Sequence, residues 1–266
     1  MPALARRPFL HISLTGLVAL GAPPLALARK PAPRAESPLV GVDPVLVASG
    51  LTARWQSAMR HDLGWAARWA PMDTGGILNQ LEQGEVDAGL FLSHPKADQL
   101  DKQGLIYDRH TVAHTDVLLL GPADDLAGIR SEADPARALS QVLAAHSAGA
   151  ALWLPPTPGS ALAALADGLT QGLASRVTSP VATGRPVPQG SPYRLLTRAQ
   201  WLKSPPRGER LKVWLSGAPR LALQAQIACS FRARHPGAKL LVNWLQWPLA
   251  QGAVKATRPA WRGIKE

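Results

Sequence analysis

Two short loops of this sequence combine hydroxyl side chains with glycine just before or within an amphipathic helical pattern. The first is Ser49-Gly50-Leu51-Thr52, and the second is Asp73-Thr74-Gly75-Gly76. Backbone N–H groups at a helix start and Ser or Thr hydroxyls are hydrogen-bond donors that suit a small anion, and glycine lets a ligand approach the backbone. Helix capping by Ser49 and Thr52, and a tight turn at Gly75-Gly76, are the alternative interpretations.

Strand-like and helix-like patterns alternate around these loops. Apolar runs at 45–48, 65–72 and 86–92 predict strands, and the spacing of apolar residues at 51–63 and 77–83 predicts helices, the second ending at Gly84. Further along the chain, the patterns predict strands at 116–121 and 150–154 and helices at 135–143, 159–169, from 197 and at 238–247. This alternation is typical of an α/β fold with parallel-rich sheets flanked by helices. In such sheets ligands bind beyond the carboxyl ends of strands, where both loops are expected.

The first 28 residues have the features of an export signal. Arg6 and Arg7 precede an apolar run that is too short to anchor the chain in a bilayer, and Ala26-Leu27-Ala28 offers a cleavage site. The paired arginines resemble a twin-arginine signal, and an ordinary secretion signal is the alternative. Residues 29–38 form a Pro-rich linker. We therefore expect a periplasmic protein that has no stable membrane insertion once the signal is removed.

The chain of 266 residues has a formal net charge of +11 and a single cysteine. A basic surface attracts anions, acidic headgroups or nucleic acid, although arginines scattered over a solvated surface give the same total. Nine tryptophans are present, and most have apolar neighbours, which favours core positions over stacking on nucleic acid. Cys229 lies in an apolar run and is expected to be a small buried side chain, with no disulfide and no cysteine metal site.

Catalytic and cofactor motifs are missing from the sequence. It has no Gly-x-Ser-x-Gly elbow, no phosphate-binding Gly-rich Lys loop and no dinucleotide fingerprint. His110 and His114 are four residues apart, but no acidic cluster or HExxH pattern accompanies them. The sequence therefore predicts a protein that is not an enzyme and has no metal site, no cofactor and no nucleic-acid partner.

Three segments in order resemble the tungstate-binding, periplasmic substrate-binding proteins of ABC transporters. They are Asp73–Leu78 continuing into Gly84–Pro95, then Asp116–Ile129, and then Tyr193–Ala199. Shorter similarities follow at 217–221 and 242–245, so that the resemblance spans roughly residues 45–250. Each motif alone is weak, because Gly-Pro turns after strands are common.

The resemblance implies a two-lobed, type II periplasmic-binding-protein fold with the ligand in the cleft between the lobes. It places lobe 1 at 39–120 plus 216–251 and lobe 2 at 121–215, with a basic tail at 252–266. It implies a monomer that passes a tungstate-like oxyanion, or another small anion, to an ABC permease or a sensor. The alternative is an extracytoplasmic interaction module that kept the fold and has no ligand.

The resemblance also supplies the expected ligand-binding residues. They are Ser49, Gly50, Thr52, Thr74, Gly75 and Gly76 in lobe 1, and Thr157, Gly159 and Ser160 in lobe 2. At 154–160, where the family has an arginine, an acid and a histidine, this chain has Leu-Pro-Pro-Thr-Pro-Gly-Ser. Arginine is the strongest side-chain partner of an oxyanion, so we hypothesise a divergent member with a different small ligand.

Overall fold

In the computed structural model, which describes residues 37–177, 190–206, 210–233 and 235–264, strands and helices alternate along most of the chain. The strands are β1 (Leu39–Val42), β2 (Arg68–Pro71), β3 (Ala88–Leu92), β4 (Ile106–Pro122), β5 (Arg194–Thr197), β6 (Leu211–Leu215) and β7 (Ala222–Ser230). The first helices are α1 (Pro44–Ala48), α2 (Leu51–Leu63), α3 (Thr74–Gln83), α4 (Pro95–Lys102) and α5 (Pro135–Ser147). They are followed by α6 (Ala161–Thr170), α7 (Leu173–Arg176), α8 (Arg198–Lys203), the short 3-10 helix η2 (Pro219–Leu221), α9 (Gly237–Trp244) and α10 (Pro248–Lys255). The expected export signal, and all but the last two residues of the expected linker, lie outside the described residues.

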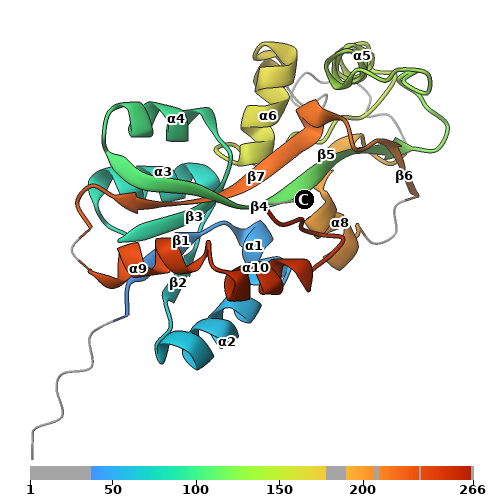
Figure 1. Ribbon diagram of the computed structural model, residues 1–266. Helices are drawn as coiled ribbons and strands as arrows, with labels where there is room; N and C mark the ends of the chain where they lie inside the picture. Colours follow the sequence, from blue (N-terminus) through green and yellow to red (C-terminus); the bar gives the residue numbers. More distant parts are fainter. Residues whose placement is uncertain (1–36, 178–189, 207–209, 234, 265–266) are drawn as a thin grey trace, which may run out of the picture. The chain divides into compact units, whose positions relative to one another are not determined.

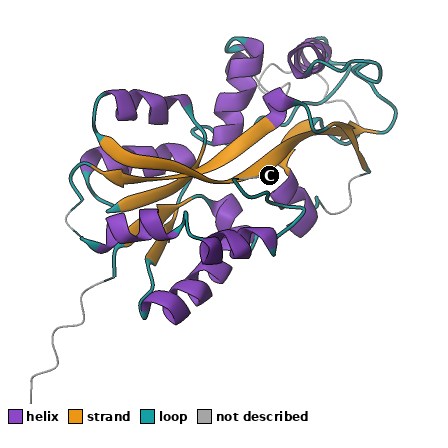
Figure 2. Cartoon of the chain, viewed as in Figure 1, coloured by secondary structure: helices purple, strands orange, loops and turns teal. Residues whose placement is uncertain are grey.

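The seven strands form one sheet with the strand order β2-β1-β3-β7-β4-β5, and β6 pairs with β4 (Figures 1 and 2). The parallel pairing expected from the alternation is found between β1 and its neighbours β2 and β3. The pairings of β4 and β7 are antiparallel, and β4 pairs with β7, β5 and β6 along its 17 residues. These two long strands therefore link the β1–β3 region to the β5–β6 region.

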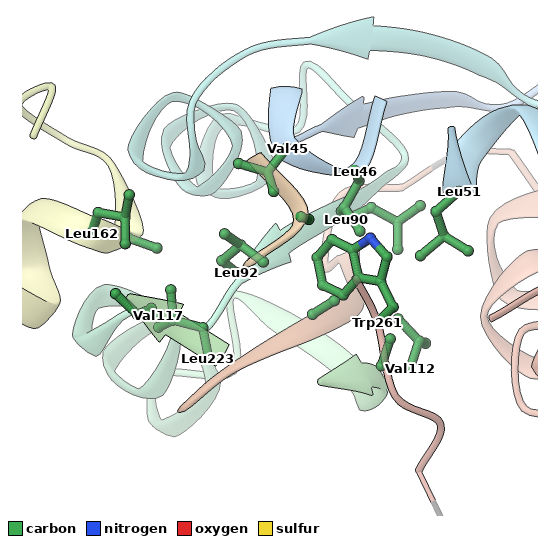
Figure 3. Packing of buried hydrophobic residues seen from close by; sticks show 14 of the residues in the cluster. Val45, Leu46, Leu51, Leu90, Leu92, Val112, Val117, Leu162, Leu223 and Trp261 are labelled. Atoms are coloured by element: carbon green, nitrogen blue, oxygen red, sulfur yellow. The ribbon is translucent and has the colours of Figure 1, made fainter. Parts of the chain in front are cut away.

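Helices cover both faces of the β1–β3 region, as the continuous burial of β3 requires. All five residues of β3 are buried. Phe91 packs in one cluster with α3 and α4, while Leu90 and Leu92 belong to the larger cluster on the opposite face. Figure 3 shows part of that larger cluster, in which the Trp261 ring lies among apolar side chains from distant parts of the chain.

Local capping residues explain why several predicted helices begin and end where expected. The Asp73 side chain accepts a hydrogen bond from the Gly76 N–H at the start of α3, and Gly84 ends α3 in the left-handed conformation at φ 78°. Asp134 caps α5, with Pro135 at its first position. These predictions are confirmed, as are the helix at 51–63 and the buried position of Cys229.

Two expectations about secondary structure need correction. The run 45–48 is helix α1 and not a strand, because Asp43 caps it and Pro44 occupies its first turn. The segment 150–154 forms only an isolated bridge, between Trp153 and Tyr193. In the segment expected as a basic tail, at 252–266, α10 runs to Lys255, and Trp261 is fully buried.

Candidate ligand-binding cleft

Several loops and helix starts border a cleft of roughly 470 Å³. We call it the Asp43 cleft, and its lining residues are Asp43, Pro44, Val45, Asp73, Leu92, Leu154, Pro155, Pro156, Thr157, Ser160, Ala161, Leu162, Arg194, Leu195, Leu196 and Gln200. One side comes from the starts of α1 and α3 and the end of β3. The other side comes from the segment 154–162 and from β5 with the start of α8. Residues more than one hundred positions apart in the sequence therefore share one cavity.

Four helix N-termini border this cleft, those of α1, α3, α6 and α8. The N-terminus of a helix carries partial positive charge and free N–H groups, so it favours a negatively charged or hydrogen-bond-accepting group. Each of the four helices is capped by its own side chain: Asp43 accepts from Val45 N–H, Asp73 from Gly76 N–H, Ser160 from Ala163 N–H and Thr197 from Gln200 N–H. The caps hold the four helix starts in place around the cavity.

Asp43 is the most buried charged group of the cleft, with 4% of its surface exposed. Its Oδ1 accepts from the Val45 N–H at 2.9 Å and its Oδ2 from the Thr74 hydroxyl at 2.7 Å. Burial raises the pKa of the Asp43 carboxyl, the two hydrogen bonds oppose that rise, and the negative charge of Asp73 adds to it. Asp43 and Asp73 thus give the lining of the cleft two acidic side chains.

Thr74, Gly75 and Gly76 follow the lining residue Asp73 at the start of α3, and their donors are already engaged. The Thr74 hydroxyl donates to Asp43 and accepts from the Leu92 N–H at 3.2 Å. The Gly75 N–H donates to the Gly159 carbonyl at 2.8 Å, and the Gly76 N–H donates to Asp73. A Cβ atom on Gly75 would lie 2.8 Å from the same Gly159 oxygen, so only glycine allows this approach.

Thr157, Gly159 and Ser160 belong to the segment that precedes α6. Thr157 and Ser160 line the cavity. Gly159 adopts φ 79° and lies against Asp73, whose Oδ1 would be 3.4 Å from a Cβ at that position. The two predicted segments, 74–76 and 157–160, are thus brought into direct contact.

Ser49, Gly50 and Thr52 lie apart from the Asp43 cleft. The Ser49 hydroxyl donates to the Leu46 carbonyl at 3.0 Å and accepts from the Trp261 indole at 2.9 Å. Thr52 is buried in α2, and Gly50 is the residue that joins α1 to α2. Because 45–48 is helical, this loop follows the carboxyl end of α1, and the cleft is met by the opposite end of that helix.

Sequence reasoning missed Asp43, Arg194 and Gln200 as cleft residues, and treated Asp73 only as part of a turn. A signal for Asp43 was present, since Asp-Pro before an apolar run is a typical helix start. Arg194 lies within the 193–199 motif, but nothing local indicates that its side chain lines a cavity.

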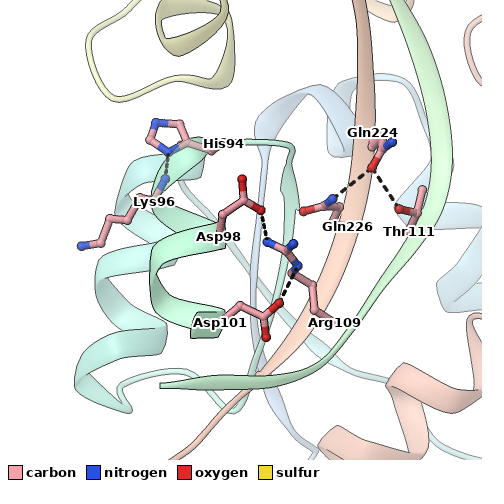
Figure 4. Close-up of polar contacts among 8 residues, drawn as sticks. All are labelled: His94, Lys96, Asp98, Asp101, Arg109, Thr111, Gln224 and Gln226. Carbon is pink, nitrogen blue, oxygen red and sulfur yellow. Dashed lines mark hydrogen bonds and ion pairs between the residues drawn. The ribbon is translucent and has the colours of Figure 1, made fainter. Parts of the chain in front are cut away.

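A second, more open hollow of about 390 Å³ lies beside α4, where His94 and Asp98 form part of its lining. His94 caps α4 by accepting from the Lys96 N–H at 3.1 Å, and burial, followed by the charge of Lys96, lowers its pKa. Figure 4 shows how Arg109 of β4 joins Asp98 at 2.8 Å and Asp101 at 3.3 Å. This network fastens α4 to β4, so we assign the charges there a structural role.

Among the described residues, no group of three or more His, Cys, Asp and Glu side chains is arranged to hold a metal ion. His110 and His114 lie on strand β4. None of the helices in the described part of the chain has the length and apolar character needed to cross a bilayer.

Comparison with solved structures identifies the fold. The chain is similar to the tungstate-binding protein TupA from Desulfovibrio alaskensis G20, with a TM-score of 0.62 and 21% identity, over 82% of this chain and 93% of that one. It is similar to the tungstate ABC transporter structure from Geobacter sulfurreducens, with a TM-score of 0.62 and 18% identity, over 83% and 98%. It is also similar to a periplasmic protein described as a candidate metal-binding protein, with a TM-score of 0.69 and 21% identity, over 85% and 96%. No protein-family model matches the sequence, and no curated protein sequence matches it either. The fold is therefore that of the periplasmic binding proteins.

Proposed function

We propose that this chain is an extracytoplasmic substrate-binding protein that holds a small molecule in the Asp43 cleft. The observation that carries the proposal is the meeting of four helix starts around one cavity, in a fold shared with tungstate-binding proteins. Ligands of open α/β folds bind beyond the carboxyl ends of strands, and β1 and β3 end at this cleft.

The cellular role proposed with it is delivery of the ligand to an ABC permease or a sensor, by a periplasmic monomer with lobes at 39–120 plus 216–251 and at 121–215. The strands β4 and β7 would cross between these lobes. The proposed site residues comprise five that line the Asp43 cleft and three that adjoin it. The lining residues are Asp43, Asp73, Thr157, Ser160 and Arg194, and the adjoining residues are Thr74, Gly75 and Gly159. Gly76 contributes through the Asp73 cap.

The ligand that the resemblance implies, a tungstate-like oxyanion, fits this cleft poorly. Two carboxylates, Asp43 and Asp73, line the cavity and would repel a doubly charged anion. The Gly75 N–H, a donor that an oxyanion would use, is bonded to Gly159. We therefore propose a ligand of another class.

Isothermal titration calorimetry and thermal shift on the mature protein test this function. We expect at least one compound of a broad small-molecule panel to raise the melting temperature, since a ligand that binds only the folded state stabilises it. We expect tungstate, molybdate and sulfate to bind weakly or not at all. Micromolar or tighter binding of tungstate would overturn the choice of ligand class but not the binding function.

The alternative function, a ligand-free interaction module, is favoured by one specific contact. The Gly159 carbonyl accepts a hydrogen bond from the Gly75 N–H, so this donor at the start of α3 is already used within the chain. Pro155, Pro156 and Pro158 also remove three backbone donors from the same segment. If no compound of the panel shifts the melting temperature, this alternative replaces the first.

A further inference from the structure

The two carboxylates of the Asp43 cleft have no cationic partner. Among the described residues, neither Asp43 nor Asp73 forms an ion pair, and both carboxylates accept hydrogen bonds from neutral N–H and O–H groups. Aspartates elsewhere in the described chain do pair with arginine: Asp98 with Arg109, and Asp116 with both Arg198 and Arg262. A buried carboxylate without a cation is costly, and Asp43 is almost fully buried. A positively charged ligand group in the cleft would offset part of this cost.

The size and lining of the cleft point away from an inorganic ion. A cavity of roughly 470 Å³ is within the range of sites for organic small molecules, and a five-atom oxyanion would fill only a small part of it. More than half of the lining side chains are apolar: Pro44, Val45, Leu92, Leu154, Pro155, Pro156, Ala161, Leu162, Leu195 and Leu196. This lining suits a ligand with a hydrocarbon part.

The lining of the cleft also includes a positively charged side chain. Arg194 of β5 lines the cavity, and the N-terminus of the ten-residue helix α6 borders it there. A guanidinium and a helix start favour a carboxylate or a similar singly charged group. The cleft thus has an acidic side at Asp43 and Asp73 and a basic side at Arg194.

We infer that the ligand is a small zwitterion of the amino-acid type, with its ammonium group toward Asp43 and Asp73, its anionic group toward Arg194 and the start of α6, and its apolar part against Leu92, Leu162 and their neighbours. The inference rests on the proposed function, since it names the ligand class of the same cleft. No covalent step is involved.

Thermal shift followed by calorimetry on the mature protein tests the charge requirement. The probes are the twenty amino acids, and, for each one that binds, its N-acetyl derivative and its amide. The N-acetyl form lacks the ammonium group and the amide lacks the carboxylate. We expect an apolar amino acid to raise the melting temperature, and each derivative to bind at least about tenfold more weakly, because truncating a buried charge pair typically costs that much.

Charge-removing variants test the acidic side. Asp43→Asn and Asp73→Asn keep an oxygen that can cap α1 and α3 while removing the negative charge. We expect each to weaken binding of the amino acid by at least about tenfold. The matched control is Asp124→Asn, in an exposed turn outside the cleft, which should leave the affinity unchanged. The melting temperature without ligand shows that each variant is folded.

The outcomes separate the two claims. Binding of tungstate or molybdate with no response to amino acids refutes the zwitterion and leaves the substrate-binding function standing. Amino-acid binding that is equal in the wild type and both Asn variants also refutes the assigned orientation. A panel in which no compound binds refutes the proposed function together with the inference.

Discussion

The contact between Gly75 and Gly159 can be tested with two neighbouring alanine substitutions in α3. Both Gly75 and Gly76 lie in the first turn of this helix. Replacing a helical glycine by alanine stabilises a protein by at most about 1 kcal/mol, through the smaller entropy loss on folding. Both substitutions bring this gain, so the difference in free energy of unfolding between the two variants depends on what the new methyl group contacts.

At Gly76 the nearest heavy atom to a new Cβ would be Asp73 Oδ1 at 3.5 Å, an ordinary contact. At Gly75 the new Cβ would lie 2.8 Å from the Gly159 oxygen and 3.3 Å from the Gly159 Cα, and both are backbone atoms. Forcing a methyl group into a closed contact costs about 1–3 kcal/mol. Losing the Gly75–Gly159 hydrogen bond adds about 0.5–1.5 kcal/mol.

We therefore expect Gly76→Ala to be neutral or stabilised by up to about 1 kcal/mol, and Gly75→Ala to be less stable than Gly76→Ala by about 1.5–4.5 kcal/mol. Urea denaturation at 25 °C, followed by tryptophan fluorescence, measures both free energies of unfolding. Equal stability of the two variants would refute the reasoning, because it would mean that the segment 155–159 does not lie against the start of α3 in solution.

Three further predictions concern other parts of the described chain. Trp261→Ala should lower the free energy of unfolding by about 3–5 kcal/mol, because it empties a buried site and removes the donor to Ser49; an unchanged urea midpoint would mean that the C-terminal segment is detached. The pKa of His94 is lowered by burial, so the unfolded state takes up a proton first, and the stabilising contribution of neutral His94 should be lost as the pH falls below about 6.5. The variant His94→Asn keeps an acceptor for the Lys96 N–H, and its urea midpoint should change less between pH 7.5 and 5 than that of the wild type. The same change of midpoint with pH in both proteins would contradict this. Burial raises the pKa of Cys229 to about 11, so iodoacetamide at pH 8 should modify the native protein about 100-fold more slowly than the unfolded protein. Mass spectrometry measures both rates, and equal rates would show that the thiol is accessible.

Elements that depend on neighbouring residues were predictable from the sequence. The start and end of α3 follow from Asp73 and Gly84, and the start of α5 follows from Asp134 and Pro135, because capping hydrogen bonds span only a few residues. The same reasoning, applied to Asp43-Pro44, identifies α1. The apolar composition of 45–48 suits a strand as well as a buried helix, and length alone did not separate the two.

The composition of the cleft was decided by tertiary structure. Ser49 has the same hydroxyl as Ser160, but its oxygen is engaged by Trp261, which is 212 positions away, while Ser160 lies at the start of a helix that faces the cavity. The Gly75–Gly159 contact joins two segments that no local pattern relates.

From the sequence alone, the α/β class and the bounds of several helices could be determined, because these depend on periodicity and caps. Short motifs also indicated the segments 74–76 and 157–160, which are now part of the proposed site. The acidic side of the cleft, the position of Arg194 opposite it and the loss of Ser49 to the core depended on how β4 and β7 bring distant segments together. Burial and strand register decide which distant residue a side chain contacts, and the neighbouring residues in the sequence do not determine either of them.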